Sequence, residues 1–145
     1  MLPVGSEAPD FLVQDHHGNR VTLKQFRGKK VVLWFYPKAG TPGCTQEGKG
    51  FRDDYQAIAG KGAEVLGVSL DNEAENRAFA EKYEFPFPLL CDTGREIALA
   101  YHAIQSKNDE YAQRISYVID EQGKILEAIE QVDTKTHSAD LCSRL

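Results

Sequence analysis

One cysteine stands where an extended apolar segment gives way to a helix. The run Val31–Tyr36 is continuously apolar, which predicts a strand buried on both faces. The loop Pro37–Gly43 follows it, and within this loop Thr41 followed by Pro42 is typical of a helix N-cap and first helical residue. Cys44 is therefore expected at the third helical position, beyond the carboxyl end of a strand, where open α/β sheets place their ligand sites.

This position suits nucleophilic sulfur chemistry. The first turn of a helix has unpaired N–H groups and the positive end of the helix dipole, and both favour a thiolate over a thiol. A thiolate can attack the O–O bond of a peroxide and become a sulfenic acid. Negative charge then develops on the departing oxygen, so hydrogen-bond donors are needed along the line of attack. The hydroxyl of Thr41, backbone N–H groups and a nearby guanidinium would meet that need.

The elements around this cysteine alternate between strands and helices. A helix is predicted over residues 42–58, although Gly48 and Gly50 inside it are unfavourable for helix formation. The other predicted elements are a hairpin of strands 11–13 and 21–23 around a Gly-containing turn at 15–19, strand 65–70, helix 72–83, an extended segment ending at 89–90, helix 95–101, strand 114–120, its hairpin partner 125–129 after a turn at 121–124, and a last helix over 134–145. This order predicts an α/β protein of thioredoxin-like arrangement, with a mixed central sheet flanked by helices and an N-terminal β-hairpin. The order by itself leaves several other α/β folds open.

Length and composition predict one ordinary domain. The 145 residues are 41% hydrophobic and 27% charged, so we expect a single domain over residues 1–145. The net charge is −5 and the Lys and Arg residues are scattered, which argues against nucleic acid as a partner. No apolar run reaches membrane-spanning length, and Met1–Pro9 lacks the basic and apolar parts of a secretory signal. We therefore expect a cytoplasmic protein with no membrane partner.

The remaining residues capable of chemistry do not form a metal or disulfide framework. The chain has three cysteines, Cys44, Cys91 and Cys142, with no Cys-x-x-Cys pair, which predicts free thiols in a reducing compartment. Cys91 follows an apolar segment, which favours its interpretation as a small buried hydrophobic residue. Cys142 lies in the C-terminal tail, where it could equally be an exposed thiol without a role or a resolving thiol. The four histidines, which lack metal-ligand spacing, are His16, His17, His102 and His137. No metal or cofactor is expected.

A family resemblance runs through most of the chain. The pattern Pro37-x-x-x-Thr41-x-x-Cys44 resembles the active-site signature of the peroxiredoxins. Its surroundings resemble the Q-type, or bacterioferritin comigratory protein, branch of that family. The segments that carry the resemblance are Tyr36-Pro37-Lys38, Thr41-Pro42-Gly43-Cys44-Thr45-x-Glu47, Phe51-Arg52-Asp53, Val4-Gly5-x-x-Ala8-Pro9-Asp10-Phe11, Val65-Leu66-Gly67-Val68-Ser69, Phe87-Pro88-Leu89-Leu90-Cys91-Asp92 and Arg114-Ile115-Ser116-Tyr117-Val118-Ile119-Asp120.

The resemblance implies a cofactor-free thiol peroxidase that serves antioxidant defence. It makes Cys44 the peroxidatic cysteine, which reduces hydrogen peroxide and organic hydroperoxides through a sulfenic acid. Thr41 would hydrogen-bond the peroxide, Pro37 would shield the site, Arg114 would stabilise the thiolate and the departing oxygen, and Glu47 would orient the arginine. The implied reductant is thioredoxin, with glutathione or glutaredoxin as other small thiol partners. The branch is often monomeric, so we expect a monomer or a weak homodimer.

The chain departs from the branch in its resolving cysteine. That residue often lies five positions after the peroxidatic one, where this sequence has Lys49. A second subgroup carries it in the following helix, which here runs through Ala78 and Ala80. The simplest hypothesis is a one-cysteine enzyme whose sulfenic acid is reduced directly by an external thiol. Cys91, which takes the place of a family serine, or Cys142 could still resolve it, within or between chains.

Plainer interpretations stand beside these roles. A lone cysteine is most often a small buried hydrophobe, but its place and signature favour a reactive role for Cys44. Thr41 could serve only as an N-cap, and Arg114 only as a solvated charge at a strand start. Two other functions compete with a peroxidase. One is a thioredoxin-like thiol–disulfide reductase, which needs a second cysteine close to Cys44, and the other is a redox-sensing or chaperone-like binding protein that uses oxidised Cys44 as a switch.

Overall fold

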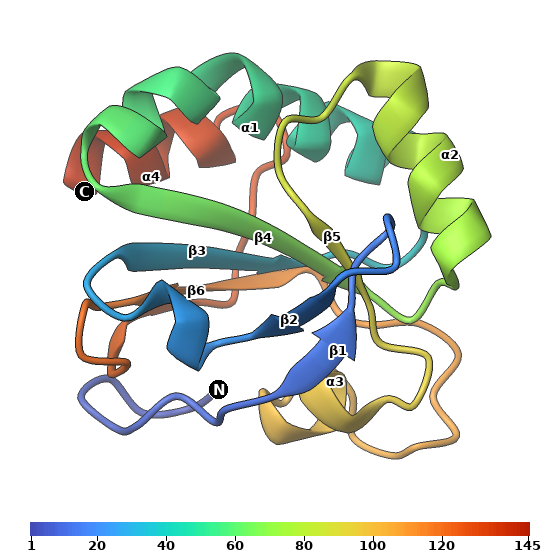
Figure 1. The fold of residues 1–145 in the computed structure, drawn as a ribbon, viewed down its shortest axis with the longest axis horizontal. Helices are drawn as coiled ribbons and strands as arrows, with labels where there is room; N and C mark the ends of the chain where they lie inside the picture. The colour runs from blue at the N-terminus through green and yellow to red at the C-terminus, as the bar shows by residue number, and fades with distance from the viewer.

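A mixed sheet of five strands organises the structure, a computed structural model that describes residues 1–145 (Figure 1). The strands lie in the order β5-β4-β3-β6-β7, with β3, β4 and β5 parallel to one another and β6 and β7 completing the sheet as antiparallel neighbours. Their bounds are β3 Lys30–Phe35, β4 Ala63–Ser69, β5 Leu89–Cys91, β6 Ile115–Ile119 and β7 Ile125–Ile129. The central place of β3 agrees with the continuous apolar run that predicted it.

Helices cover both faces of this sheet. One face carries α1 (Pro42–Gly60), α2 (Glu73–Tyr83) and α4 (His137–Arg144), as Figure 1 shows above the strands. The other face carries α3 (Glu96–Ala100) and the N-terminal hairpin of β1 (Leu12–Gln14) and β2 (Arg20–Thr22). The predicted α/β class, the flanked mixed sheet and the N-terminal hairpin are therefore confirmed.

Strand β3 lacks hydrophobic alternation because it contributes to two cores at once. Leu33 and Phe35 pack into the core beneath α3 and the hairpin. Val32 and Trp34, which point to the opposite face, pack into the core beneath α1, α2 and α4. Both faces exclude water from Val31 onward, so every position from Val31 to Phe35 is apolar and buried. The residue that follows it, Tyr36, is also fully buried.

The two glycines inside α1 allow close approach of other segments rather than breaking the helix. The helix runs without interruption from Pro42 to Gly60. A Cβ on Gly48 would lie 2.5 Å from the ring of Phe85, and one on Gly50 would lie 2.7 Å from Oγ of Ser138 at the start of α4. The cost in helix propensity is thus offset by packing of segments that are distant in sequence.

The other elements appear where the sequence predicts them, with ends shifted by a few residues. Helix α2 begins with a reciprocal capping box, in which the Asn72 side chain accepts from the Glu75 amide and the Glu75 carboxylate accepts from the Asn72 amide. A 3-10 helix over Lys24–Phe26 was not predicted. No helix combines the length and the apolar character that crossing a bilayer requires.

Candidate active site

Cys44 lies in the first turn of α1, after the loop that connects β3 to this helix. The strand ends at Phe35, and the helix begins at Pro42, so Cys44 is the third helical residue, as predicted. Its thiol is free and its side chain is completely buried. It lines none of the five cavities of the structure, although its neighbours Thr41 and Gly43 are partly exposed. Cys44 is thus a buried residue beyond the carboxyl end of β3.

Arg114 reaches this sulfur from the neighbouring strand. It precedes β6, which runs antiparallel to β3, so the start of β6 lies beside the end of β3. The Nη2 atom of Arg114 is 3.5 Å from Sγ of Cys44. Burial opposes the charge of the guanidinium, but Cys44 and Glu47 outweigh it and raise the pKa of Arg114. A Cβ on Gly43 would lie 2.9 Å from Nη2, so only glycine leaves this path open without displacing the arginine.

Glu47 holds the other side of the guanidinium. It lies one helical turn after Cys44, and its Oε1 accepts a hydrogen bond of 2.8 Å from Nη1 of Arg114. The carboxyl is fully buried, and this burial raises the pKa of Glu47 to about 7, although Arg114 acts in the opposite direction. Its second oxygen, Oε2, has no hydrogen-bond partner. The sequence-predicted trio of Cys44, Arg114 and Glu47 is thus brought into direct contact.

The hydroxyl of Thr41 is not used as a helix cap. Thr41 has the extended backbone of an N-cap residue, but its side chain makes no cap hydrogen bond. Instead Oγ1 donates to the carbonyl of Lys38 over 2.7 Å. The hydroxyl proton is therefore engaged inside the loop, and the oxygen lone pairs remain available as acceptors. The first-turn amides of α1, which a capping hydroxyl would have occupied, receive no side-chain partner.

The loop that carries Pro37 is fastened to the start of α2. Lys38 forms ion pairs with Asp71, at 2.6 Å, and with Glu75. The Asp71 carboxylate also accepts from the amide of Ala39 over 2.8 Å. Pro37 is partly buried and lines a surface cavity of about 210 Å³ beside Lys38. These ties hold the loop over Cys44, and sequence patterns did not reveal them because they join segments more than thirty residues apart.

Two polar side chains next to Glu47 also went unassigned in the sequence. Nε2 of His137, the first residue of α4, lies 2.8 Å from Oγ of Ser116 and 3.9 Å from Oε2 of Glu47. Burial, and then the charge of Arg144, lower the pKa of His137 to about 4, so the imidazole is neutral near pH 7. The only signal available in the sequence was a histidine without metal-ligand spacing. Its place beside α1 follows from tertiary packing alone.

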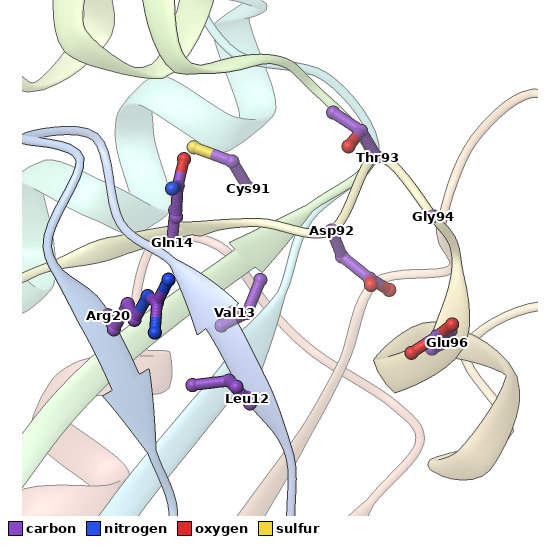
Figure 2. A pocket seen from close by; sticks show the side chains of 9 residues that line it. All are labelled: Leu12, Val13, Gln14, Arg20, Cys91, Asp92, Thr93, Gly94 and Glu96. Carbon is purple, nitrogen blue, oxygen red and sulfur yellow. The ribbon is translucent and has the colours of Figure 1, made fainter.

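Cys91 lines a cavity that Cys44 does not line. It ends β5 and lines a cavity of about 450 Å³ together with residues of the N-terminal hairpin such as Gln14, as Figure 2 shows. Asn76 Nδ2 lies 3.4 Å from its sulfur, and burial is the main cause that raises the pKa of the Cys91 thiol. None of the residues lining this cavity contacts Cys44 through a hydrogen bond. Cys91 and Cys44 therefore share neither a cavity nor a hydrogen bond.

Cys142 lies at the far end of α1. Helix α4 runs alongside α1 in the same direction, since Ser138 donates to Asp54 over 2.7 Å and Lys61 donates to the carbonyl of Cys142 further along. Lys61 follows Cys44 by seventeen positions, which is roughly 25 Å of helix. A disulfide needs Cα atoms within about 7 Å of each other. The fold therefore separates Cys142 from Cys44 within one chain.

Comparison with known proteins places the sequence among named relatives. It matches the model of the AhpC/TSA family over residues 4–128. It is 41% identical over 121 residues to peroxiredoxin Q, chloroplastic, of Triticum aestivum, a match that covers 83% of this chain and 56% of the relative. It is 37% identical over 149 residues to the putative peroxiredoxin bcp of Coxiella burnetii, covering 99% of each. The chain thus spans about half of the chloroplastic relative and nearly all of the bacterial one.

Solved structures share the fold over almost the whole chain. The peroxidoxin BcpB of Mycobacterium tuberculosis superposes with a TM-score of 0.91 at 29% identity, covering 99% of this chain and 96% of that one. The bacterioferritin comigratory protein of Xanthomonas campestris, solved in work on its alkyl peroxide reduction activity, gives a TM-score of 0.89 at 26% identity, covering 98% of this chain and 96% of that one. The thioredoxin-like arrangement expected from the order of elements is confirmed.

Proposed function

The chain belongs to the AhpC/TSA family, among the peroxiredoxins of the Q or bacterioferritin comigratory type, and we propose that Cys44 is the cysteine with which it reduces hydroperoxides. Its bacterial relatives over the full length are peroxiredoxins, so the chain is a thiol-dependent peroxidase, an oxidoreductase. One observation carries the assignment to Cys44. Arg114 Nη2 is 3.5 Å from a free sulfur in the first turn of a helix. We further propose that residues 1–145 act as one peroxiredoxin domain.

The first step is nucleophilic attack by sulfur. The guanidinium of Arg114 and the open amides of the first turn favour the thiolate of Cys44. The thiolate attacks the terminal oxygen of the hydroperoxide, so an S–O bond forms as the O–O bond breaks. Cys44 is oxidised to a sulfenic acid that keeps the hydroxyl oxygen. The peroxide is reduced to an alkoxide or hydroxide, which takes a proton from water.

Neighbouring side chains orient the peroxide. The lone pairs of the Thr41 hydroxyl accept the peroxide O–H, because the hydroxyl proton is already donated to the Lys38 carbonyl. Arg114 donates to the oxygen on which charge develops, and Glu47 fixes the guanidinium plane for that task. Pro37 limits access of water. The Arg114 side chain is 23% exposed, so a small displacement of it opens a path to the buried sulfur.

The oxidised enzyme is then returned to the thiol by an external reductant. A thiol condenses with the sulfenic acid to give a mixed disulfide and water, and a second thiol releases Cys44. We propose a thioredoxin-type dithiol or another small thiol for this role, acting on a one-cysteine enzyme, because neither Cys91 nor Cys142 lies beside Cys44. The same absence of a neighbouring cysteine removes the basis for a thiol–disulfide reductase. We place the enzyme in the cytoplasm as a monomer or weak homodimer, whereas its plant relatives are named chloroplastic.

Rapid mixing with peroxide tests the assignment. We expect Cys44→Ser to abolish the fast consumption of hydrogen peroxide and of an alkyl hydroperoxide, and Cys91→Ser to leave both unchanged. The same result for Cys142→Ser would show that the fast phase belongs to Cys44 alone. Fast consumption that survives in Cys44→Ser would refute the proposal and favour another thiol. Slow and equal rates in all variants would favour the redox-sensing alternative.

A further inference from the structure

We propose that His137 is a positioning residue of this peroxidase, which stabilises the ionised form of Glu47 and so keeps Arg114 in place against Cys44. The inference rests on the proposed function of Cys44 and extends it to a residue from the C-terminal helix. His137 touches neither the sulfur nor the position of the peroxide. It acts on Glu47, which in turn holds Arg114.

The buried carboxyl of Glu47 creates the need for such a residue. Its side chain has no exposed surface, and only one of its oxygens is hydrogen-bonded, to Arg114. A buried carboxylate oxygen without a partner strongly disfavours the charged form. Nε2 of His137 faces this oxygen at 3.9 Å, which is too long for a hydrogen bond but close enough for the N–H dipole to act on the charge. A shift of roughly 1 Å would close the contact.

The surroundings allow His137 to present that N–H. With hydrogen on Nε2, this N–H donates to Oγ of Ser116 over 2.8 Å, and its positive end still lies 3.9 Å from Oε2 of Glu47. The ring of Phe51 packs edge-on against the imidazole and excludes water. The histidine is also the first residue of α4, which Ser138 ties to α1 through Asp54. The imidazole is therefore held in place on both sides.

The titration of these groups sets the direction of the effect. Burial raises the pKa of Glu47 to about 7, so near neutral pH a weak neighbour decides how much of it is ionised. Burial also lowers the pKa of His137 to about 4, so His137 acts as a neutral dipole. The charged and titratable groups that face the pair are Arg114 and Cys44 at the site and Asp140 and Arg144 on α4, and the neutral hydroxyl of Ser116 on β6 completes the surroundings. Loss of the imidazole removes the polar group that faces Oε2 at 3.9 Å and favours protonated Glu47, which binds the guanidinium less firmly.

Substitution at His137 tests this role by rate and by pH profile. We expect His137→Leu to lower the rate constant for hydrogen peroxide about tenfold, a cost typical of slight misplacement of a catalytic group. The rise of that rate constant with pH should move to higher pH. His137→Gln, whose amide can donate to Oε2, should restore most of the rate and the pH profile. His17→Leu is the matched control, because His17 is exposed in the hairpin turn.

The outcomes separate this inference from the proposed function. Loss of all fast peroxide consumption in Cys44→Ser, together with a wild-type rate and pH profile in His137→Leu, would overturn the role of His137 and leave the peroxidase intact. Equal losses in His137→Leu and His137→Gln without a pH shift would also overturn it, since packing alone would explain them. If His137→Leu fails to fold, His137→Phe, which keeps a ring in the same packing position but has no N–H, takes its place. A profile of His137→Phe displaced toward higher pH, beside a near-wild-type profile of His137→Gln, would support the role, and an unchanged profile of His137→Phe would refute it.

Discussion

Phe35 of β3 lies directly opposite Ile115 of β6, and this pairing sets the geometry of the site. The chain leaves Phe35 toward the helix that carries Cys44, while Arg114 immediately precedes Ile115. Cys44 and the guanidinium of Arg114 therefore approach from adjacent strands, at the end of β3 and the start of β6. A one-residue slip of β6 would turn Arg114 to the opposite face, so the apolar register of two buried strands also specifies the distance between sulfur and arginine.

Removal of the guanidinium should greatly weaken peroxide reduction. We expect Arg114→Met to lower the rate constant for hydrogen peroxide by about 10²-fold, as for loss of one donor to a developing oxyanion. Arg114→Lys should recover only part of it, because a lysine cannot contact Glu47 and Cys44 with two separate nitrogens. Stopped-flow consumption of peroxide measures the effect, with exposed Arg20→Lys as control. A wild-type rate in Arg114→Met would contradict the assignment.

A methyl group at Gly43 should act on activity without harming the fold. The Cβ of Gly43→Ala would lie 2.9 Å from Nη2 of Arg114 and displace it. The helix itself should gain slightly from alanine, by up to about 1 kcal/mol. We therefore expect a melting temperature at or above that of the wild type and a peroxide rate constant lowered about tenfold. When Gly43→Ala is added to Arg114→Met, the peroxide rate constant should not fall further. A further loss would show that Gly43→Ala acts on the rate by a route other than displacement of Arg114.

A methyl group at Gly48 should instead lower the stability of the fold. Its Cβ would lie 2.5 Å from the ring of Phe85, which is buried among other aromatic rings. Overpacking of this kind costs about 1–3 kcal/mol, more than alanine returns in helix propensity. We expect Gly48→Ala to lower the free energy of unfolding in urea. Gly60→Ala, which meets nothing within 4 Å, is the control and should not be destabilised. Added Phe85→Leu should relieve the loss, and failure to do so would exclude the clash.

Glu47→Gln should change how stability depends on pH. Burial raises the pKa of Glu47 from 4.5 to about 7, so between these values the folded protein keeps a proton that the unfolded chain has released. The contribution of Glu47 to stability is therefore largest below pH 4.5 and declines as pH rises to about 7. The decline amounts to about 3 kcal/mol. Urea unfolding across this range should show that the decline is absent in Glu47→Gln.

The contribution of His137 to stability changes with pH in the opposite direction, over a pH range that overlaps that of Glu47. Burial lowers its pKa from 6.5 to about 4, so its contribution is fully present above pH 6.5 and is lost as pH falls through about 4. In the wild type the two groups partly cancel. Stability of Glu47→Gln should therefore rise more steeply from about pH 4 to 6.5 than that of the wild type. Parallel profiles for the two proteins would contradict the raised pKa of Glu47, and a Glu47→Gln profile that does not rise between these pH values would contradict the lowered pKa of His137.

Trapping of the oxidised sulfur tests the one-cysteine hypothesis. After one equivalent of peroxide, a sulfenic-acid reagent should label Cys44, and mass spectrometry should find no disulfide between Cys44 and either Cys91 or Cys142 within a chain. The double variant Cys91→Ser/Cys142→Ser should keep steady-state turnover with a dithiol reductant. A Cys44–Cys142 link that forms as fast as the peroxide is consumed would make Cys142 the resolving cysteine and would require large movement of α4.

Local patterns were enough to predict the helices, the strands and the α/β class, but only part of the site. The apolar run of β3 and the Thr41–Pro42 helix start placed Cys44 correctly, because both signals act within a few residues. Arg114 was found through family resemblance, since a charge before a strand carries no local sign of its target. His137 escaped notice because its role depends on where α4 packs. The glycines of α1 were unfavourable by propensity, and only the long-range approach of other segments explains them.

The course of α4 beside α1 has a consequence for the order of events in turnover. The N-terminal end of α4 carries His137, which faces Glu47 and through it supports the position of Arg114 against Cys44. The C-terminal end of α4 carries Cys142. Delivering Cys142 to the oxidised sulfur would require the helix to detach, and detachment would withdraw His137 from Glu47. A chain that used its own terminal thiol would thus have to rebuild its site after every cycle. A reductant arriving from outside leaves the site assembled and ready for the next peroxide.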